Sequence, residues 1–107
     1  MISTHILDTS LGIPAKNVTV ILEKKENESW IIIANDHTNT DGRIVFNNPN
    51  VSGVYRLNFE IENYYRATGQ ETFFETIPVI FKIENTDRKY HVPLLLNPFG
   101  YSTYRGS

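Results

Sequence analysis

Short runs of β-forming residues, each closed by a turn signal, recur along almost the whole chain. This pattern is typical of an all-β sandwich or barrel, and it argues against a helical or a βαβ fold. One segment, 62–69, instead combines helix-forming residues with a closing Gly69, which predicts a single short helix. The strands that we predict, about eight in number, are 2–8, 18–24, 29–36, 43–46, 53–61, 76–84, 89–97 and 101–107.

Three of these strands carry more specific expectations. Residues 29–36 are so apolar that we expect the strand to be buried on both faces. The Asp41-Gly42 pair favours the positive φ angles of a tight turn, directly before the strand that begins at Arg43. Pro78 lacks the N–H group that a central strand needs, so we expect its strand at the edge of a sheet.

The length and charge of the chain are those of an ordinary globular protein. At 107 residues, without a repeat or a linker, it fits a single domain over 1–107. Its 10 basic and 12 acidic residues give a net charge of -2, so neither nucleic acid nor an anionic membrane is expected as a partner. The absence of cysteine excludes disulfides, thiolate nucleophiles and cysteine-based zinc sites.

The first residues predict no targeting signal. The segment MISTHILDTSLG has no basic head followed by an apolar run, and no stretch approaches the length of a membrane span. We therefore expect a cytoplasmic protein. Three Asn-x-Ser/Thr triplets begin at Asn17, Asn27 and Asn50 and would have no role in a protein that is not secreted, so we interpret them as chance.

Two histidines lie on strands, and the alternation of each strand indicates which face they share. In strand 89–97 the even-numbered residues form an apolar row, which leaves His91 on the opposite face. In strand 2–8 the even-numbered residues likewise point one way and leave His5 on the other face. A lone strand histidine is usually a partly exposed surface or interface residue. Two on the non-core faces of separate strands make a shared site the competing interpretation.

Neither a metal nor a cofactor is predicted. No His-x-His or His-x-x-x-His spacing is present, Asp8 is better explained as a turn-forming residue, and His37 as a histidine of a polar loop. The chain also lacks a glycine-rich phosphate loop, a nucleophile elbow and His-Glu-x-x-His. An enzyme with this sequence would use cofactor-free acid–base chemistry on a small molecule.

Arg43 and the closing residues are ambiguous from their positions alone. Arg43 is either a solvated edge charge or a guanidinium that holds a carbonyl or an anionic ring through paired hydrogen bonds. Tyr104, Arg105, Gly106 and Ser107 form either an exposed tail or a tip where glycine lets the backbone approach a ligand.

Three segments resemble the signature sequences of one enzyme family. STHILDTSLGIPA at 3–15, TNTDGR at 38–43 and YHVPLLLNPFGYSTYRGS at 90–107 are similar to those of the 5-hydroxyisourate hydrolases, the transthyretin-related enzymes of purine catabolism. The similarity runs from Ile2 to Ser107. The closing Tyr-Arg-Gly-Ser is the segment that separates these enzymes from transthyretin.

The resemblance implies a transthyretin-like sandwich of two sheets with one short helix. It also implies a homotetramer, a dimer of dimers, with active sites at the two mouths of a central channel. The site residues that it implies are His5, Arg43, His91 and Ser107 for catalysis, and Tyr104, Arg105 and Gly106 for substrate binding.

The implied reaction is hydrolysis of 5-hydroxyisourate at a ring amide, which opens the six-membered ring and yields 2-oxo-4-hydroxy-4-carboxy-5-ureidoimidazoline. Our hypothesis is that the histidine pair activates a water, while Arg43 holds the substrate and stabilises the oxyanion. Ser107 would hydrogen-bond substrate or water, and an α-carboxylate so close to the site would be ionised. Which histidine takes the proton of the water is open.

The chain departs from the family pattern at three positions, and the sequence leaves two alternative functions open. Asn97 and Phe99 stand where the family has serine and tyrosine, and Lys89 stands where it often has histidine. The alternatives are a non-catalytic, transthyretin-like carrier of a small ligand and a sandwich module that only mediates protein contacts. Two histidines and Arg43 in place of an apolar lining argue against the carrier.

Overall fold

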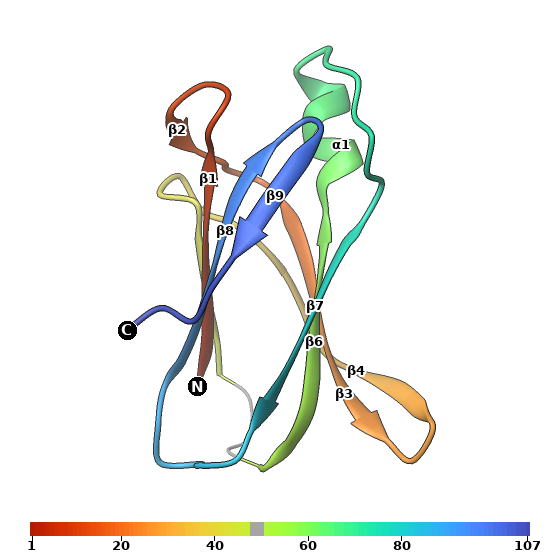
Figure 1. Ribbon diagram of the computed structural model, residues 1–107, viewed down its shortest axis with the longest axis vertical. Coiled ribbons are helices and arrows are strands. Elements are labelled where there is room, and N and C mark those ends of the chain that lie inside the picture. The colour runs from red at the N-terminus through yellow and green to blue at the C-terminus, as the bar shows by residue number, and fades with distance from the viewer. Residues whose placement is uncertain (48–50) are drawn as a thin grey trace.

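The computed structural model describes residues 1–47 and 51–107, and it shows two β-sheets packed face to face with a helix at one end (Figure 1). The helix, α1, spans Ile61–Ala67. Sheet A contains β1 (Ile2–Asp8), β2 (Ile13–Pro14), β5 (Arg43–Phe46), β8 (Tyr90–Asn97) and β9 (Gly100–Thr103). Sheet B contains β3 (Thr19–Glu26), β4 (Ser29–His37), β6 (Gly53–Glu60) and β7 (Ile77–Ile83). The two-sheet sandwich with one helix is therefore confirmed. The described residues add the short β2 to the predicted strands, and the last strand, predicted over 101–107, ends at Thr103.

The order of the strands brings the two ends of the chain together. Sheet A runs β2-β1-β8-β9, with β5 also paired to β1, and sheet B runs β4-β3-β6-β7. β1 and β8 are parallel, in a register from Ile2 opposite Tyr90 to Asp8 opposite Leu96. The first strand therefore lies directly beside the penultimate one. β7 lies at an edge of sheet B, as Pro78 indicated.

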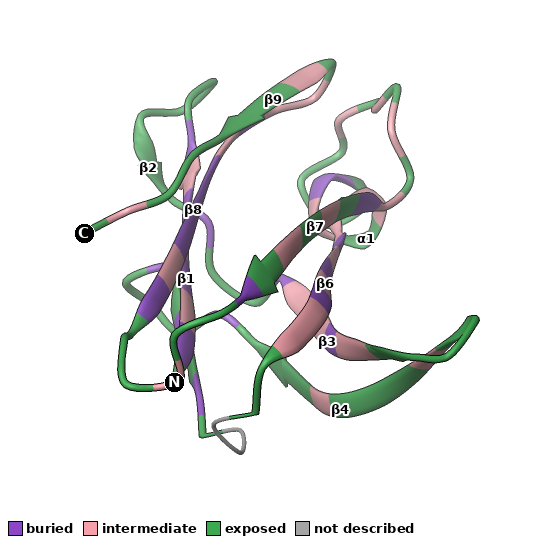
Figure 2. Ribbon diagram, turned by 60° about the horizontal axis from the view of Figure 1, so that its bottom comes forward, coloured by how far each residue is buried: buried purple, intermediate pink, exposed green. Residues whose placement is uncertain are grey.

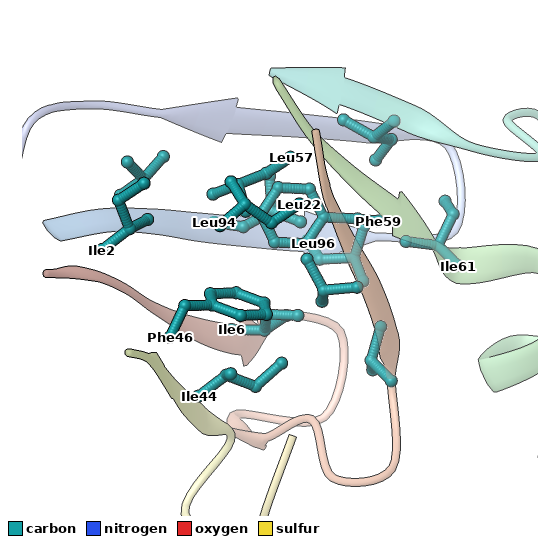
Figure 3. Close-up of a cluster of buried hydrophobic side chains, with 14 of the residues drawn as sticks. Ile2, Ile6, Leu22, Ile44, Phe46, Leu57, Phe59, Ile61, Leu94 and Leu96 are labelled. Atoms are coloured by element: carbon teal, nitrogen blue, oxygen red, sulfur yellow. The ribbon is translucent and has the colours of Figure 1, made fainter. Parts of the chain in front are cut away.

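One cluster of buried side chains from both sheets fills the space between them (Figure 3). Ile2 and Ile6 of β1 and Leu94 of β8 face Leu57 and Phe59 of β6. Burying each such side chain stabilises the fold by roughly 1.5–3 kcal/mol. The even-numbered residues of β1 and β8 are buried, which confirms the predicted faces of both strands.

The helix begins directly after β6 and ends close to the predicted position. Ile61, which the alternation placed in a strand, is its first residue, and Ile61 and Tyr65 face the core. Glu62 and Arg66 form an ion pair one turn apart on the exposed side. Gly69 follows with a φ of 75°, as expected for a glycine just beyond the end of a helix.

The prediction that 29–36 is buried on both faces is wrong. Ile31, Ile32 and Ile33 of β4 are 48%, 63% and 36% exposed, and Figure 2 shows most of this strand in the colour of exposed residues. β4 lies at the edge of sheet B, and within the described residues it pairs only with β3. An apolar run alone does not distinguish a doubly buried strand from such an edge strand. His37, predicted in a loop, is the last residue of β4.

Two of the Asn-x-Ser/Thr triplets begin at turn positions. Asn17 and Asn27 have φ angles of 60° and 58°, a conformation that asparagine tolerates better than most residues. Asn50 lies outside the described residues. No helix among the described residues is long and apolar enough to cross a membrane.

Gly42 should be the glycine whose replacement destabilises the fold most. Its φ is +74°, and a Cβ on it would lie 2.6 Å from the backbone oxygen of Ile6, inside the β1–β5 contact. We expect Gly42→Ala to lower the free energy of unfolding by roughly 2–4 kcal/mol, measured by urea denaturation. Gly12→Ala is the control, because Gly12 has a φ of +70° but no atom within 4 Å of the added methyl. Equal losses in the two variants would contradict the proposed clash.

Candidate active site

Four polar side chains from three strands meet on the outward face of sheet A. His5 of β1 stands directly opposite Arg43 of β5 in the antiparallel pair, and Ser3 stands opposite His91 of β8 in the parallel pair. Residues opposite one another on neighbouring strands share a face, so all four side chains point away from the core. The N–H group of Ile6 donates to the oxygen of Gly42 at 2.8 Å, which fixes the start of β5 and thus the position of Arg43.

The chain beyond β9 continues alongside β8 and reaches His91 at Gly106. The N–H group of Gly106 donates to the backbone oxygen of His91 at 2.8 Å, an isolated β-bridge. A Cβ on Gly106 would lie 2.5 Å from Cδ2 of the His91 ring, so the tail lies directly against the imidazole. On its other side, Nδ1 of His91 is 2.8 Å from Oγ of Ser3. The ring is therefore held between the first strand and the tail.

These groups border a hollow of about 220 Å³. Its lining is rich in hydrogen-bond donors, because the guanidinium of Arg43, the ammonium group of Lys89 and the hydroxyls of two serines all take part. Such a lining suits a carbonyl or an anionic ring. The residues that line it are Ser3, Thr4, Arg43, Ile44, Val45, Lys89, His91 and Ser107.

The surroundings of His91 favour its neutral form. Partial burial lowers the pKa of His91 below its ordinary value of 6.5, and the charges of Arg43 and His5 lower it further. Near neutral pH the imidazole therefore keeps one free lone pair and one N–H group. A neutral imidazole of this kind can act as a base or as a hydrogen-bond donor.

The predicted site residues divide into two groups. Arg43, His91 and Ser107 line the hollow, Gly106 bridges to His91 beside it, and His5 stands opposite Arg43 on the same face of sheet A without lining the hollow. Tyr104 and Arg105 instead line a separate hollow of about 210 Å³ beside β7, which shares only His91 with the first. The guanidinium of Arg105 lies 5.3 Å from the centre of the Tyr90 ring.

Two residues of the hollow had no predicted role. Ser3 begins the family-like segment 3–15 and shares a face with His5, and Lys89 stands where the family often has histidine. Asp8 is confirmed in its turn: its carboxylate accepts hydrogen bonds from the N–H group of Ser10 at 3.0 Å and from the hydroxyl of Tyr64 at 2.8 Å. In the part of the chain that the structure describes, no group of three or more histidine or carboxylate side chains could hold a metal ion.

A two-sheet sandwich with β1 and β8 parallel, one short helix after β6 and a polar site on the outward face of sheet A defines a transthyretin-like protein. Residues 2–106 match the HIUase/Transthyretin family, and the chain belongs to that family.

Its relatives include both enzymes and a ligand-binding protein. The 5-hydroxyisourate hydrolase of Salmonella typhimurium is 46% identical over 110 residues, which cover 100% of this chain and 81% of the relative. The solved structure of Klebsiella pneumoniae 5-hydroxyisourate hydrolase has a TM-score of 0.86 and 41% identity, over 99% of this chain and 98% of that one. Sea bream transthyretin in complex with thyroxine has a TM-score of 0.92 and 31% identity, over 98% of this chain and 93% of that one. The fold alone therefore does not separate the two functions.

The lowered pKa of His91 can be measured directly. In an NMR titration of the histidine ring protons, we expect a midpoint for His91 below 6.5. Arg43→Gln should move this midpoint upward, because a nearby positive charge that opposed protonation is gone. Arg66→Gln, which removes an exposed arginine of α1, should leave it in place. A midpoint that does not respond to Arg43→Gln would contradict the electrostatic link between the two residues.

Proposed function

We propose that this protein hydrolyses 5-hydroxyisourate at a ring amide. The observation that carries the proposal is that His5, Arg43 and His91 share the outward face of sheet A, beside a hollow that Arg43 and His91 line together with other donors. The likeness to proteins named 5-hydroxyisourate hydrolase, at 46% and 41% identity, supports it further. A single transthyretin-like hydrolase domain over 1–107 is proposed with it, since both sheets contribute to one core.

The mechanism that we propose uses only side chains of this face. A water loses a proton to one imidazole of the pair while its oxygen bonds to the ring carbonyl carbon, and Arg43 stabilises the negative oxygen that forms. The carbon–nitrogen bond then breaks, and the departing ring nitrogen takes up a proton from an imidazole. The acid–base groups contribute roughly 10²- to 10⁴-fold, and the oxyanion partner roughly 10²- to 10³-fold. No cofactor enters these steps.

The closing residues bound the space for the substrate. Ser107 lines the hollow and is proposed to hydrogen-bond substrate or water. Gly106 lets the tail lie against His91, where any side chain would collide with the ring. Tyr104 and Arg105 line the space on the other side of His91, and we propose that they limit the substrate from there.

We further propose that the protein acts as a homotetramer, a dimer of dimers. The hollow of about 220 Å³ is smaller than the roughly 300–1,000 Å³ of most small-ligand pockets, which supports completion by a second subunit. A cytoplasmic location and the absence of nucleic-acid and membrane partners stay predictions from the sequence.

A transthyretin-like carrier is the second candidate. The TM-score of 0.92 to a transthyretin that binds thyroxine favours it. Arg43 and Lys89 in the lining argue against it, because desolvating charged groups opposes the binding of an apolar ring unless each charge finds a partner.

A direct assay separates these candidates. Urate oxidase generates 5-hydroxyisourate in the cuvette, and the ultraviolet decay of the compound is followed with and without this protein. We expect acceleration by the protein, and a loss of at least about 10²-fold in kcat/KM for His5→Asn and for His91→Asn. His37→Asn, at the exposed end of β4, is the control and should keep full activity. A protein that binds the compound without speeding its decay would sink the hydrolase proposal in favour of the carrier.

Gly106→Ala tests whether the tail takes part in the site, because the substitution adds only one methyl group. Gly106→Ala places a methyl group 2.5 Å from Cδ2 of His91, so the ring or the tail must move. We expect kcat/KM to fall by roughly 10- to 100-fold, because small displacements of catalytic groups cost that much, while the urea midpoint stays the same. Gly100→Ala, whose added methyl has its nearest neighbour at 3.7 Å, should retain activity. Full activity in Gly106→Ala would remove the tail from the site.

A further inference from the structure

His91 has a partner that none of the roles above uses. Ser3 and His91 are opposite one another in the parallel β1–β8 register, on the outward face, and Oγ of Ser3 is 2.8 Å from Nδ1 of the ring. This contact occupies Nδ1. The Cδ2 edge of the ring faces Gly106, so Nε2 is the ring nitrogen left for a substrate.

The direction of this hydrogen bond decides what Nε2 can do. A neutral imidazole carries its single proton on one nitrogen and a lone pair on the other. If Nδ1 donates to Ser3, Nε2 presents a lone pair and can act as a base. If the hydroxyl of Ser3 donates to Nδ1, Nε2 carries the proton and can only donate. The two directions therefore give His91 opposite roles.

The other groups around Ser3 favour donation from the hydroxyl. Arg43 and Lys89 line the same hollow, and their N–H groups can only donate. The positive charges of these two side chains favour a hydroxyl whose oxygen faces the hollow and whose proton bonds the lone pair of Nδ1. Burial and the charges of Arg43 and His5 keep the ring neutral, which provides that lone pair.

We propose that Ser3 is a positioning residue whose hydroxyl donates to Nδ1 of His91, so that the neutral ring carries its proton on Nε2. His91 then donates this N–H group to the carbonyl oxygen of the substrate, and His5 takes the proton of the attacking water. The tautomer is a property of the protein alone, whereas the division of labour between the histidines rests on the proposed hydrolase function. Neutral imidazoles are effective electrophiles of this kind in other enzymes.

The tautomer can be tested without substrate. In protein labelled with ¹⁵N at histidine, a long-range ¹H–¹⁵N spectrum recorded above the titration of His91 distinguishes a protonated ring nitrogen from an unprotonated one. We expect Nε2 of His91 to be protonated and Nδ1 to be unprotonated, and we expect Ser3→Ala to mix the two tautomers. A proton on Nδ1 in the unmodified protein, or an unchanged spectrum in Ser3→Ala, would overturn the proposal.

Kinetics test the consequence. We expect Ser3→Ala to lower kcat roughly 5- to 10-fold with little change in KM, as for the loss of one hydrogen bond, and Ser3→Thr to restore it. Thr9→Val is the matched control, because its hydroxyl also joins the β1 side to β8, at 3.1 Å from the oxygen of Leu96, but lies beyond the site. Full kcat in Ser3→Ala, or an equal loss in Thr9→Val, would refute a positioning role. If the protein does not hydrolyse 5-hydroxyisourate, the spectrum still decides the tautomer, so the two proposals can fail separately.

Discussion

The parallel pairing of β1 with β8 is the constraint on which the rest of the structure depends. Its register runs without interruption from Ile2 opposite Tyr90 to Asp8 opposite Leu96. A slip of one residue would turn the buried side of either strand to solvent, so the apolar residues on that side specify the register. The same register sets Ser3 beside His91 and carries His5 along on the same face. The packing of the core therefore also aligns the two imidazoles, although the core lies on the inward face of sheet A and both imidazoles lie on its outward face.

One edge of β1 serves two strands, and this division places Arg43. β5 pairs with residues 2–5 of that edge and β2 with residues 7 and 8, so the change of partner falls directly after His5. Gly42 lies at this junction in a left-handed conformation, close against the backbone of Ile6. A larger residue would push β5 away from β1 and take the guanidinium with it. The left-handed backbone at Gly42, which only glycine adopts easily, thus sets the distance between the charge of Arg43 and the other groups of the site.

Local sequence patterns predict much of this arrangement. The even-numbered apolar rows of β1 and β8 were enough to put His5 and His91 outside the core, and Asp41-Gly42 was enough to start a strand at Arg43. Alternation says nothing about which strands become neighbours, so the contact between Ser3 and His91, 88 residues apart, could not be foreseen. It also fails for uninterrupted apolar runs, which is why β4 was placed in the interior. The tail shows a second limit of prediction, because its residues occupy two different hollows although they are adjacent in sequence.

What distinguishes the hollow at Arg43 is the electrostatics of its lining. Partial burial lowers the pKa of His91, and the guanidinium, which cannot lose its proton, lowers this pKa further and so favours an uncharged ring before substrate arrives. In the proposed mechanism, the same positive charge attracts the negative oxygen as it forms, and this attraction offsets the repulsion that favours a neutral imidazole. Under that mechanism the lining stabilises the transition state more than the bound substrate, which is the property that separates a catalyst from a carrier on a shared fold.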